Sequence, residues 1–113
     1  MSIATTYDQF ILSADMTLHD ALIAITANKR GTVIIVDDSN HVQGVVSDGD
    51  IRRALVRGGT QLTPILKVAN TNFLSVQQST SSDFEKIFQD HAEITIIPIV
   101  DKNNLLVGVA VRD

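Results

Sequence analysis

The stretch of residues 44–53 holds the residue types best suited to binding a charged ligand. It reads Gly-Val-Val-Ser-Asp-Gly-Asp-Ile-Arg-Arg, where an apolar run gives way to the predicted start of a helix. A hydroxyl, two carboxylates and two guanidinium groups follow one another there: Ser47, Asp48, Asp50, Arg52 and Arg53. The first N–H groups of a helix have no partner inside it and carry the positive end of its dipole, so they favour phosphate oxygens. Asp50 can accept paired hydrogen bonds from a ribose diol, and Gly49 lets the backbone approach a ligand closely.

The same residues also have a purely structural interpretation. Ser47 followed by Asp50 is a capping box, in which the hydroxyl accepts the N–H three residues on and the acid bonds back to the cap. Asp48 and Asp50 have the chemistry to hold Mg²⁺ beside a nucleotide, although two carboxylates in a cap are most simply caps. The paired arginines favour a ligand, because cations in a first helical turn cost about 0.3–1 kcal/mol unless an anion lies nearby. The sequence leaves cap and ligand site open.

The elements that position this corner follow from apolar spacing. Residues 32–36 form a β-branched run, a turn follows at 37–40, and residues 42–46 predict the returning antiparallel strand. The helix that opens around Asp48 places Ile51, Ala54 and Leu55 on one face and stops at Gly58 and Gly59. Upstream, the spacing predicts a helix over 17–28, capped by Thr17 and Asp20 and closed by Lys29, Arg30 and Gly31.

The second half repeats this order. A short strand over 74–76 is followed by helix caps at 79–82, an apolar stripe at Phe84, Ile87 and Phe88, and a strand–turn–strand over 94–111. Val36-Asp37 matches Val100-Asp101, and Gly44-Val45 matches Gly108-Val109, both 64 positions apart. These matches predict an internal duplication.

The two copies are not equivalent. Val111 stands where Ser47 stands in the first copy, and the counterpart of Asp50 would lie just past Asp113. We therefore expect one ligand site per chain and a chain that is part of a longer protein.

Composition excludes several function classes. The chain has 113 residues, 44% of them hydrophobic, and a net charge of −4, which argues against a nucleic-acid surface. Without cysteine it has no disulfide or thiolate zinc site, and its apolar runs are too short for a membrane span. The scattered histidines, His19, His41 and His91, show no metal-ligand spacing, and no catalytic grouping is readable. We expect a cytoplasmic protein with no catalytic residues, no metal and no membrane or nucleic-acid partner.

A phosphoacceptor receiver domain is the main rival in fold. Residues 33–38 resemble its acidic-pair strand. That pair belongs on the first strand of a receiver, however, and here a helix precedes it, so the sequence disfavours this alternative.

From about Phe10 to Asp113 the chain resembles a pair of CBS domains (named for cystathionine β-synthase). The resemblance rests on the stretch 44–53 in the first copy and on Ile-Pro-Ile-Val-Asp at 97–101 and Leu-Val-Gly-Val at 106–109 in the second. It implies an α/β fold of two β-α-β-β-α repeats packed sheet to sheet, with the last helix truncated. The repeats would span 10–58 and 73–113, joined by a linker at 59–72. The stretch Ser-Asp-Gly-Asp-Ile-Arg-Arg resembles pairs attached to sugar-nucleotide nucleotidyltransferases and to arabinose-5-phosphate-type sugar-phosphate isomerases.

This resemblance implies a regulatory module, not an enzyme, that binds an adenosine or other nucleotide, with AMP, ADP or ATP as the possible ligands, between the repeats. Ser47 would contact phosphate, Asp50 the ribose, and Arg52 and Arg53 would be further phosphate partners. The purine edge would meet backbone near Thr32 and Val33. The family also implies a flat homodimeric disc and, after Asp113, a catalytic domain, in the first place a sugar-nucleotide nucleotidyltransferase. The alternatives are a vestigial pair that serves as a dimerisation scaffold and the regulatory part of a sugar-phosphate isomerase.

Overall fold

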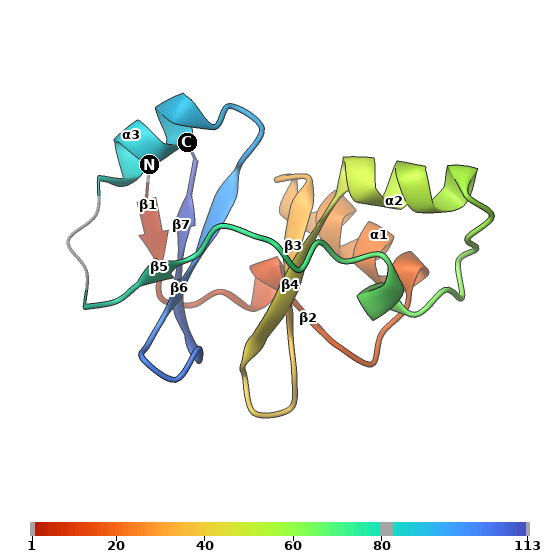
Figure 1. The fold of residues 1–113 in the computed structure, drawn as a ribbon, viewed down its shortest axis with the longest axis horizontal. Helices are drawn as coiled ribbons and strands as arrows, with labels where there is room; N and C mark the ends of the chain where they lie inside the picture. The colour runs from red at the N-terminus through yellow and green to blue at the C-terminus, as the bar shows by residue number, and fades with distance from the viewer. Residues whose placement is uncertain (1, 80–82, 113) are drawn as a thin grey trace.

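Two small β-sheets face each other, and helices cover their outer sides (Figure 1). The structure is a computed structural model and describes residues 2–79 and 83–112. The first sheet has the order β2 (Ile11–Ser13), β3 (Thr32–Val36) and β4 (Val42–Ser47). The second has the order β1 (Ser2–Ala4), β7 (Leu106–Val111), β6 (Ile96–Val100) and β5 (Val76–Gln77). In both sheets an antiparallel hairpin, β3–β4 or β6–β7, carries a parallel neighbour, β2 or β5.

The helices alternate with these strands in the predicted order. α1 (Leu18–Asn28) and α2 (Asp48–Val56) belong to the first sheet, and α3 (Phe84–Asp90) to the second. Short 3-10 turns, η1 (Asp8–Phe10) and η2 (Ile65–Lys67), lie before β2 and in the connection after α2. In the described part of the chain, no helix combines the length and apolar character that crossing a membrane requires. The predicted α/β architecture of two packed repeats is confirmed.

Three details of the sequence prediction were wrong. Leu55 does not join the apolar face of α2: its side chain is 43% exposed, because it lies near the free end of the helix. Leu74 is 39% exposed and precedes β5, which begins at Val76. The cap of α3 is Asp83, whose carboxylate accepts the N–H of Lys86 at 3.2 Å. Residues 80–82, within the stretch 79–82 proposed as caps, lie outside the described residues.

The inner faces of the two sheets form one shared core. Ile34, Val36 and Val42 of the first sheet pack with Val100, Leu106 and Val109 of the second in one buried cluster. Separate clusters lie between each sheet and its own helices. Neither repeat closes its inner face alone, so the two should unfold together.

The duplication extends to backbone geometry. Ile35 pairs with Gly44 and Ile99 with Gly108, and both hairpins shift register at the next residue. The turns contain left-handed asparagines at equivalent positions, Asn40 with φ 70° and Asn104 with φ 65°. These geometries confirm the 64-residue repeat.

The two turns also bond to each other reciprocally. The amide of Asn40 donates to the carbonyl of Leu106 at 2.9 Å, and the amide of Asn104 donates to the carbonyl of Val42 at 3.0 Å. The N–H groups of Val42 and Leu106 return these bonds to the asparagine carbonyls at 3.2 and 3.0 Å. The hairpins are thus related by a local two-fold arrangement.

The segment leading into each repeat packs on the other repeat. β1 pairs with β7, with Ala4 opposite Val109. Asn70, ahead of β5, exchanges N–H···O bonds with Val45 of β4 at 2.8 and 3.0 Å. Gly44 permits this approach, because a Cβ there would lie 3.0 Å from the Asn70 carbonyl oxygen. The crossing brings the connection between repeats to the edge of the site described next.

Candidate functional site

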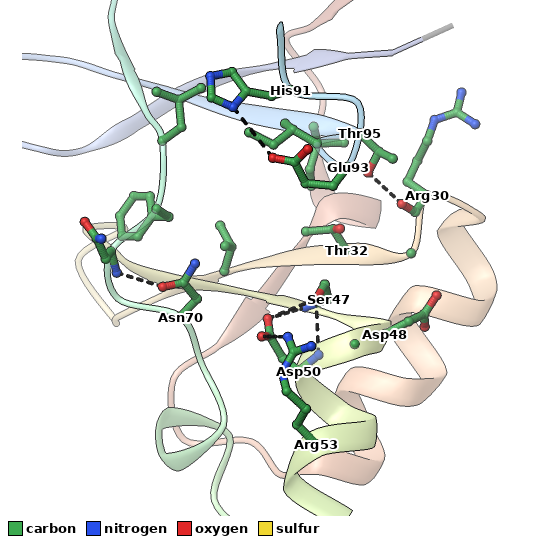
Figure 2. Close-up of a pocket in the computed structure, with 18 residues that line it drawn as sticks. Arg30, Thr32, Ser47, Asp48, Asp50, Arg53, Asn70, His91, Glu93 and Thr95 are labelled. Atoms are coloured by element: carbon green, nitrogen blue, oxygen red, sulfur yellow. Dashed lines mark hydrogen bonds and ion pairs between the residues drawn. The ribbon is translucent and has the colours of Figure 1, made fainter. Parts of the chain in front are cut away.

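A cavity of about 760 Å³ lies between the two repeats. Figure 2 shows its walls: the corner where β4 becomes α2 on one side and the loop after α3 on the other. The start of β3 and the segment 70–74 complete it. Apolar side chains contribute part of its lining: Val45, Phe73, Leu74, Ile94 and Ile96. A site formed by both repeats responds to their relative position.

Ser47 and Asp50 form the capping box that the sequence allowed, and both also line the cavity. One carboxylate oxygen of Asp50 accepts hydrogen bonds from the N–H of Ser47 at 2.9 Å and from the hydroxyl of Ser47 at 3.0 Å. The other accepts Nη2 of Arg53 at 2.8 Å. The capping box and a role in the cavity are therefore compatible, because the oxygen that accepts from Arg53 keeps one lone pair for a ligand.

The N–H groups at the start of α2 are largely occupied. That of Asp48 donates to the carbonyl of Gly31 at 3.0 Å, and that of Asp50 donates to the Ser47 hydroxyl at 3.2 Å. Two of the three N–H groups that a phosphate could meet here thus already have acceptors. This corner offers an anion fewer free donors than an uncapped helix start.

Asp48 lines the cavity but does not converge with Asp50. Its carboxylate lies over Gly31, where a Cβ would be 3.1 Å from Oδ2, and points away from Asp50 (Figure 2). In residues 2–79 and 83–112 no three His, Asp or Glu side chains group closely enough to hold a metal ion.

The paired arginines diverge. Arg53 lines the cavity, with its guanidinium folded over Gly49, where a Cβ would lie 3.2 Å from Nη1. Arg52 is exposed and is not part of the cavity wall. Successive residues of a helix point about 100° apart, which explains why only one of them reaches the site.

Thr32 and Val33, the residues expected near a purine, also separate. Thr32 lines the cavity at the start of β3. Val33 is fully buried in the core between the first sheet and its helices. Alternation along a strand places their side chains on opposite faces.

The opposite wall was missed by sequence reasoning. It comes from the second repeat, and His91, Glu93 and Thr95 contribute to it. The Thr95 hydroxyl donates to the carbonyl of Arg30 at 2.6 Å, which ties the two repeats together at the cavity. The duplication held a signal for this wall, because Thr95 is the counterpart of Gly31.

Arg112 holds that wall in place. Its guanidinium donates to the carbonyls of Phe88 at 2.6 Å, His91 at 2.9 Å and Ile94 at 2.8 Å. It also stacks over the Phe88 ring, 4.7 Å from the centroid. The loop after α3 is thereby fixed to the end of β7.

The carboxyl groups with a lowered pKa lie outside the cavity lining. The N–H and hydroxyl of Thr17 lower the pKa of Asp20 by bonding to its carboxylate in the capping box of α1. The N–H groups of His41 and Ser39 lower the pKa of Asp37 in the first hairpin turn. Both shifts reflect hydrogen bonds that hold turns and caps together.

Comparison with known proteins points to one family. The family model described as CBS domain matches residues 2–57. The arabinose 5-phosphate isomerase GutQ of Escherichia coli K12 is 37% identical over 90 residues, which are 79% of this chain and 28% of GutQ. The chain therefore spans about 28% of the length of that relative.

Solved structures agree with this result. The acetoin utilization protein AcuB of Vibrio cholerae is 28% identical, with a TM-score of 0.79 over 96% of this chain and 80% of AcuB. The CBS domain protein PAE2072 of Pyrobaculum aerophilum, solved in complex with AMP, is 22% identical, with a TM-score of 0.72 over 89% of this chain and 78% of that protein. At 22% identity the latter likeness concerns the fold.

Proposed function

Because this chain belongs to the CBS-domain family, we propose that it is a regulatory module that binds an adenine nucleotide in the cavity between its repeats. The observation that best supports this proposal is the cavity itself, which is lined by a polar corner of one repeat and by a loop of the other. The AMP bound to PAE2072 supports an adenine nucleotide as the ligand.

The lining divides by chemistry in a way that suits a nucleoside. Phe73, Leu74 and Ile96 offer apolar surface to a base. Asp50 offers the remaining lone pair of its carboxylate to a ribose hydroxyl, and Thr32 adds a hydroxyl at the edge of β3. Binding regulates by favouring one arrangement of the two repeats over another, because both line the cavity.

Calorimetric titration with AMP, ADP and ATP tests this proposal. We expect saturable binding, with a dissociation constant near the micromolar range, which corresponds to about 8 kcal/mol. Asp50→Ala should abolish it. That substitution also breaks the capping box of α2. The control variant must therefore break a capping box whose residues do not line the cavity.

Asp20→Ala is that control. The Thr17–Asp20 box on α1 has the same bonds as the Ser47–Asp50 box, and neither of its residues lines the cavity. Both variants should lose stability, while only Asp50→Ala should lose the ligand. If the wild type shows no saturable binding even at millimolar nucleotide, the proposal is overturned.

Self-association is the second candidate function, and exposed apolar side chains favour it. Val56 is 87% exposed, Leu62 80% and Leu66 45%. They belong to α2, η2 and their connection, which lie at one end of the molecule (Figure 1). We propose that this end mediates homodimerisation. Light scattering should show a dimer that Val56→Asp converts to a monomer, and a monomeric wild type at high micromolar concentration would contradict this.

For the whole protein we propose control of a sugar-phosphate isomerase, because GutQ is 37% identical. The nucleotidyltransferase expected from the sequence has no such support among the relatives described above. We retain repeats at 10–58 and 73–113 and a linker at 59–72 as proposed boundaries. Activity of the full-length protein on arabinose 5-phosphate, changed by AMP, would support this assignment, and nucleotidyl transfer instead of isomerisation would refute it.

A further inference from the structure

A second hollow adjoins the cavity and differs from it in charge. It has a volume of about 250 Å³ and lies between the second half of α2 and the connection to η2. Asp50 and Arg53 line both hollows, so they form the boundary between them. The smaller hollow, here called the basic groove, adds Arg57, Lys67 and Thr63 to its lining.

The main cavity is a poor place for several phosphates. Its lining holds two arginines and three carboxylates, Asp48, Asp50 and Glu93, and these five groups have a net charge of −1. The Arg30 guanidinium points away from Ser47 and Asp50 (Figure 2). The N–H groups of Asp48 and Asp50 already have acceptors. A polyphosphate confined to this cavity would meet net repulsion.

The basic groove has the opposite balance. Arg53, Arg57 and Lys67 against Asp50 leave a net charge of +2. Among the ion pairs of the described residues, Arg53 takes part in one, with Asp50, and Arg57 and Lys67 take part in none. Arginines in the last turn also complement the helix dipole, but Lys67 is on η2 and has no such role toward α2.

We propose that the basic groove receives the outer phosphates of the ligand, so that the site prefers a nucleoside di- or triphosphate to a monophosphate. The base and ribose occupy the main cavity, and the phosphate chain crosses over Arg53 to Arg57 and Lys67. This inference rests on the proposed function, because it assumes that a nucleoside occupies the main cavity.

Calorimetric titration of AMP, ADP and ATP into three proteins tests the inference: the wild type, the double variant Arg57→Ala/Lys67→Ala, and the control Lys86→Ala/Lys102→Ala. The control removes the same charge, and neither of its residues lines a hollow. All four side chains are exposed, so both variants should fold.

We expect the wild type and the control to bind ATP about tenfold or more tightly than AMP, the effect of one charge-assisted hydrogen bond. In Arg57→Ala/Lys67→Ala the affinity for ATP should fall to that for AMP, with the affinity for AMP unchanged. The preference should shrink as salt screens the groove.

Equal affinity of the wild type for AMP and ATP, or a preference that survives the double substitution, overturns the inference and leaves the proposed function standing. Absence of binding by all three nucleotides overturns the proposed function itself.

Discussion

The two repeats turn the same backbone corner with different side chains. In the first, the N–H of Asp48 donates to the carbonyl of Gly31 at 3.0 Å, and in the second the N–H of Arg112 donates to that of Thr95 at 2.8 Å. The residue before Asp48 is Ser47, which is half-buried at the cavity, whereas the residue before Arg112 is Val111, which is buried in the shared core. Duplication has preserved the backbone bond while the side chains have diverged.

The difference shows how one of two equivalent corners becomes a support for the other. Asp48 lies at the edge of the cavity, whereas Arg112 binds three carbonyls of the loop after α3. That loop is the far wall of the same cavity, with His91, Glu93 and Thr95. The second corner therefore positions a wall, and the first corner provides the polar groups that face it.

The largest expected effect tests whether the repeats are one folding unit at all. Leu106 is 2% exposed in the shared core, so Leu106→Ala should destabilise the protein by about 2–5 kcal/mol. Its counterpart Val42 has one methylene fewer, and Val42→Ala should cost less by about 0.8 kcal/mol. Chemical denaturation followed by two probes, one in each repeat, should give one coincident transition. Two separate transitions would mean that the two repeats fold as independent domains.

Arg112→Ala should have the next largest effect, about 2–3 kcal/mol, because it removes three charge-assisted hydrogen bonds from a half-buried guanidinium. The matched control is Arg52→Ala, an exposed arginine outside the cavity wall, which should stay within about 0.5 kcal/mol. Urea denaturation measures both. Equal costs for the two variants would remove the structural role assigned to the second corner.

The caps of the first repeat should lose stability equally but differ in binding. Ser47→Ala and Thr17→Ala each remove an N-cap hydroxyl and should cost about 1 kcal/mol. Only Ser47 lines the cavity, so only Ser47→Ala should weaken AMP binding. Thermal unfolding with and without AMP separates the two effects. Equal loss of binding in both variants would show that affinity follows helix stability and not contact.

The smallest effect concerns the hairpin turns. Asp37 accepts the N–H of His41 and of Ser39, and its pKa is lowered in the folded state. A lowered folded pKa contributes stability above the ordinary value, near pH 4, that is lost as the pH falls through the folded pKa. Asp37→Asn should therefore flatten the fall in stability as the pH drops below about 4. An unchanged acid slope in denaturant titrations would show that these bonds do not stabilise the turn.

Much of the fold could be predicted from the sequence because local rules and the duplication agreed. The β-branched run at 32–36, the Asx turn before His41 and the Thr17–Asp20 box each depend on neighbours within a few residues. The burial of Leu55 was predicted wrongly, because apolar periodicity marks one face of a helix but does not show how far along that face the rest of the protein packs.

The site was only half predictable for the same reason. Ser47, Asp50 and Arg53 belong to one continuous stretch, so their proximity followed from helix geometry. The wall at 91–96 reaches them only through the packing of two sheets. Arg112 is separated from Phe88 by 24 positions, and no pattern in the sequence marks it as their link.

One measurement tests the central claim, that the first corner binds the ligand and the second only supports its wall. Amide chemical shifts should be followed by NMR while AMP is titrated into the wild-type chain. We expect saturable shifts at residues 47–53 and 70–74 and along the wall at 91–96, with little change at Val109 or at Tyr7, which packs on the shared core. Shifts centred on Val109 and Val111 instead, with the Ser47–Arg53 amides unmoved, would contradict the account.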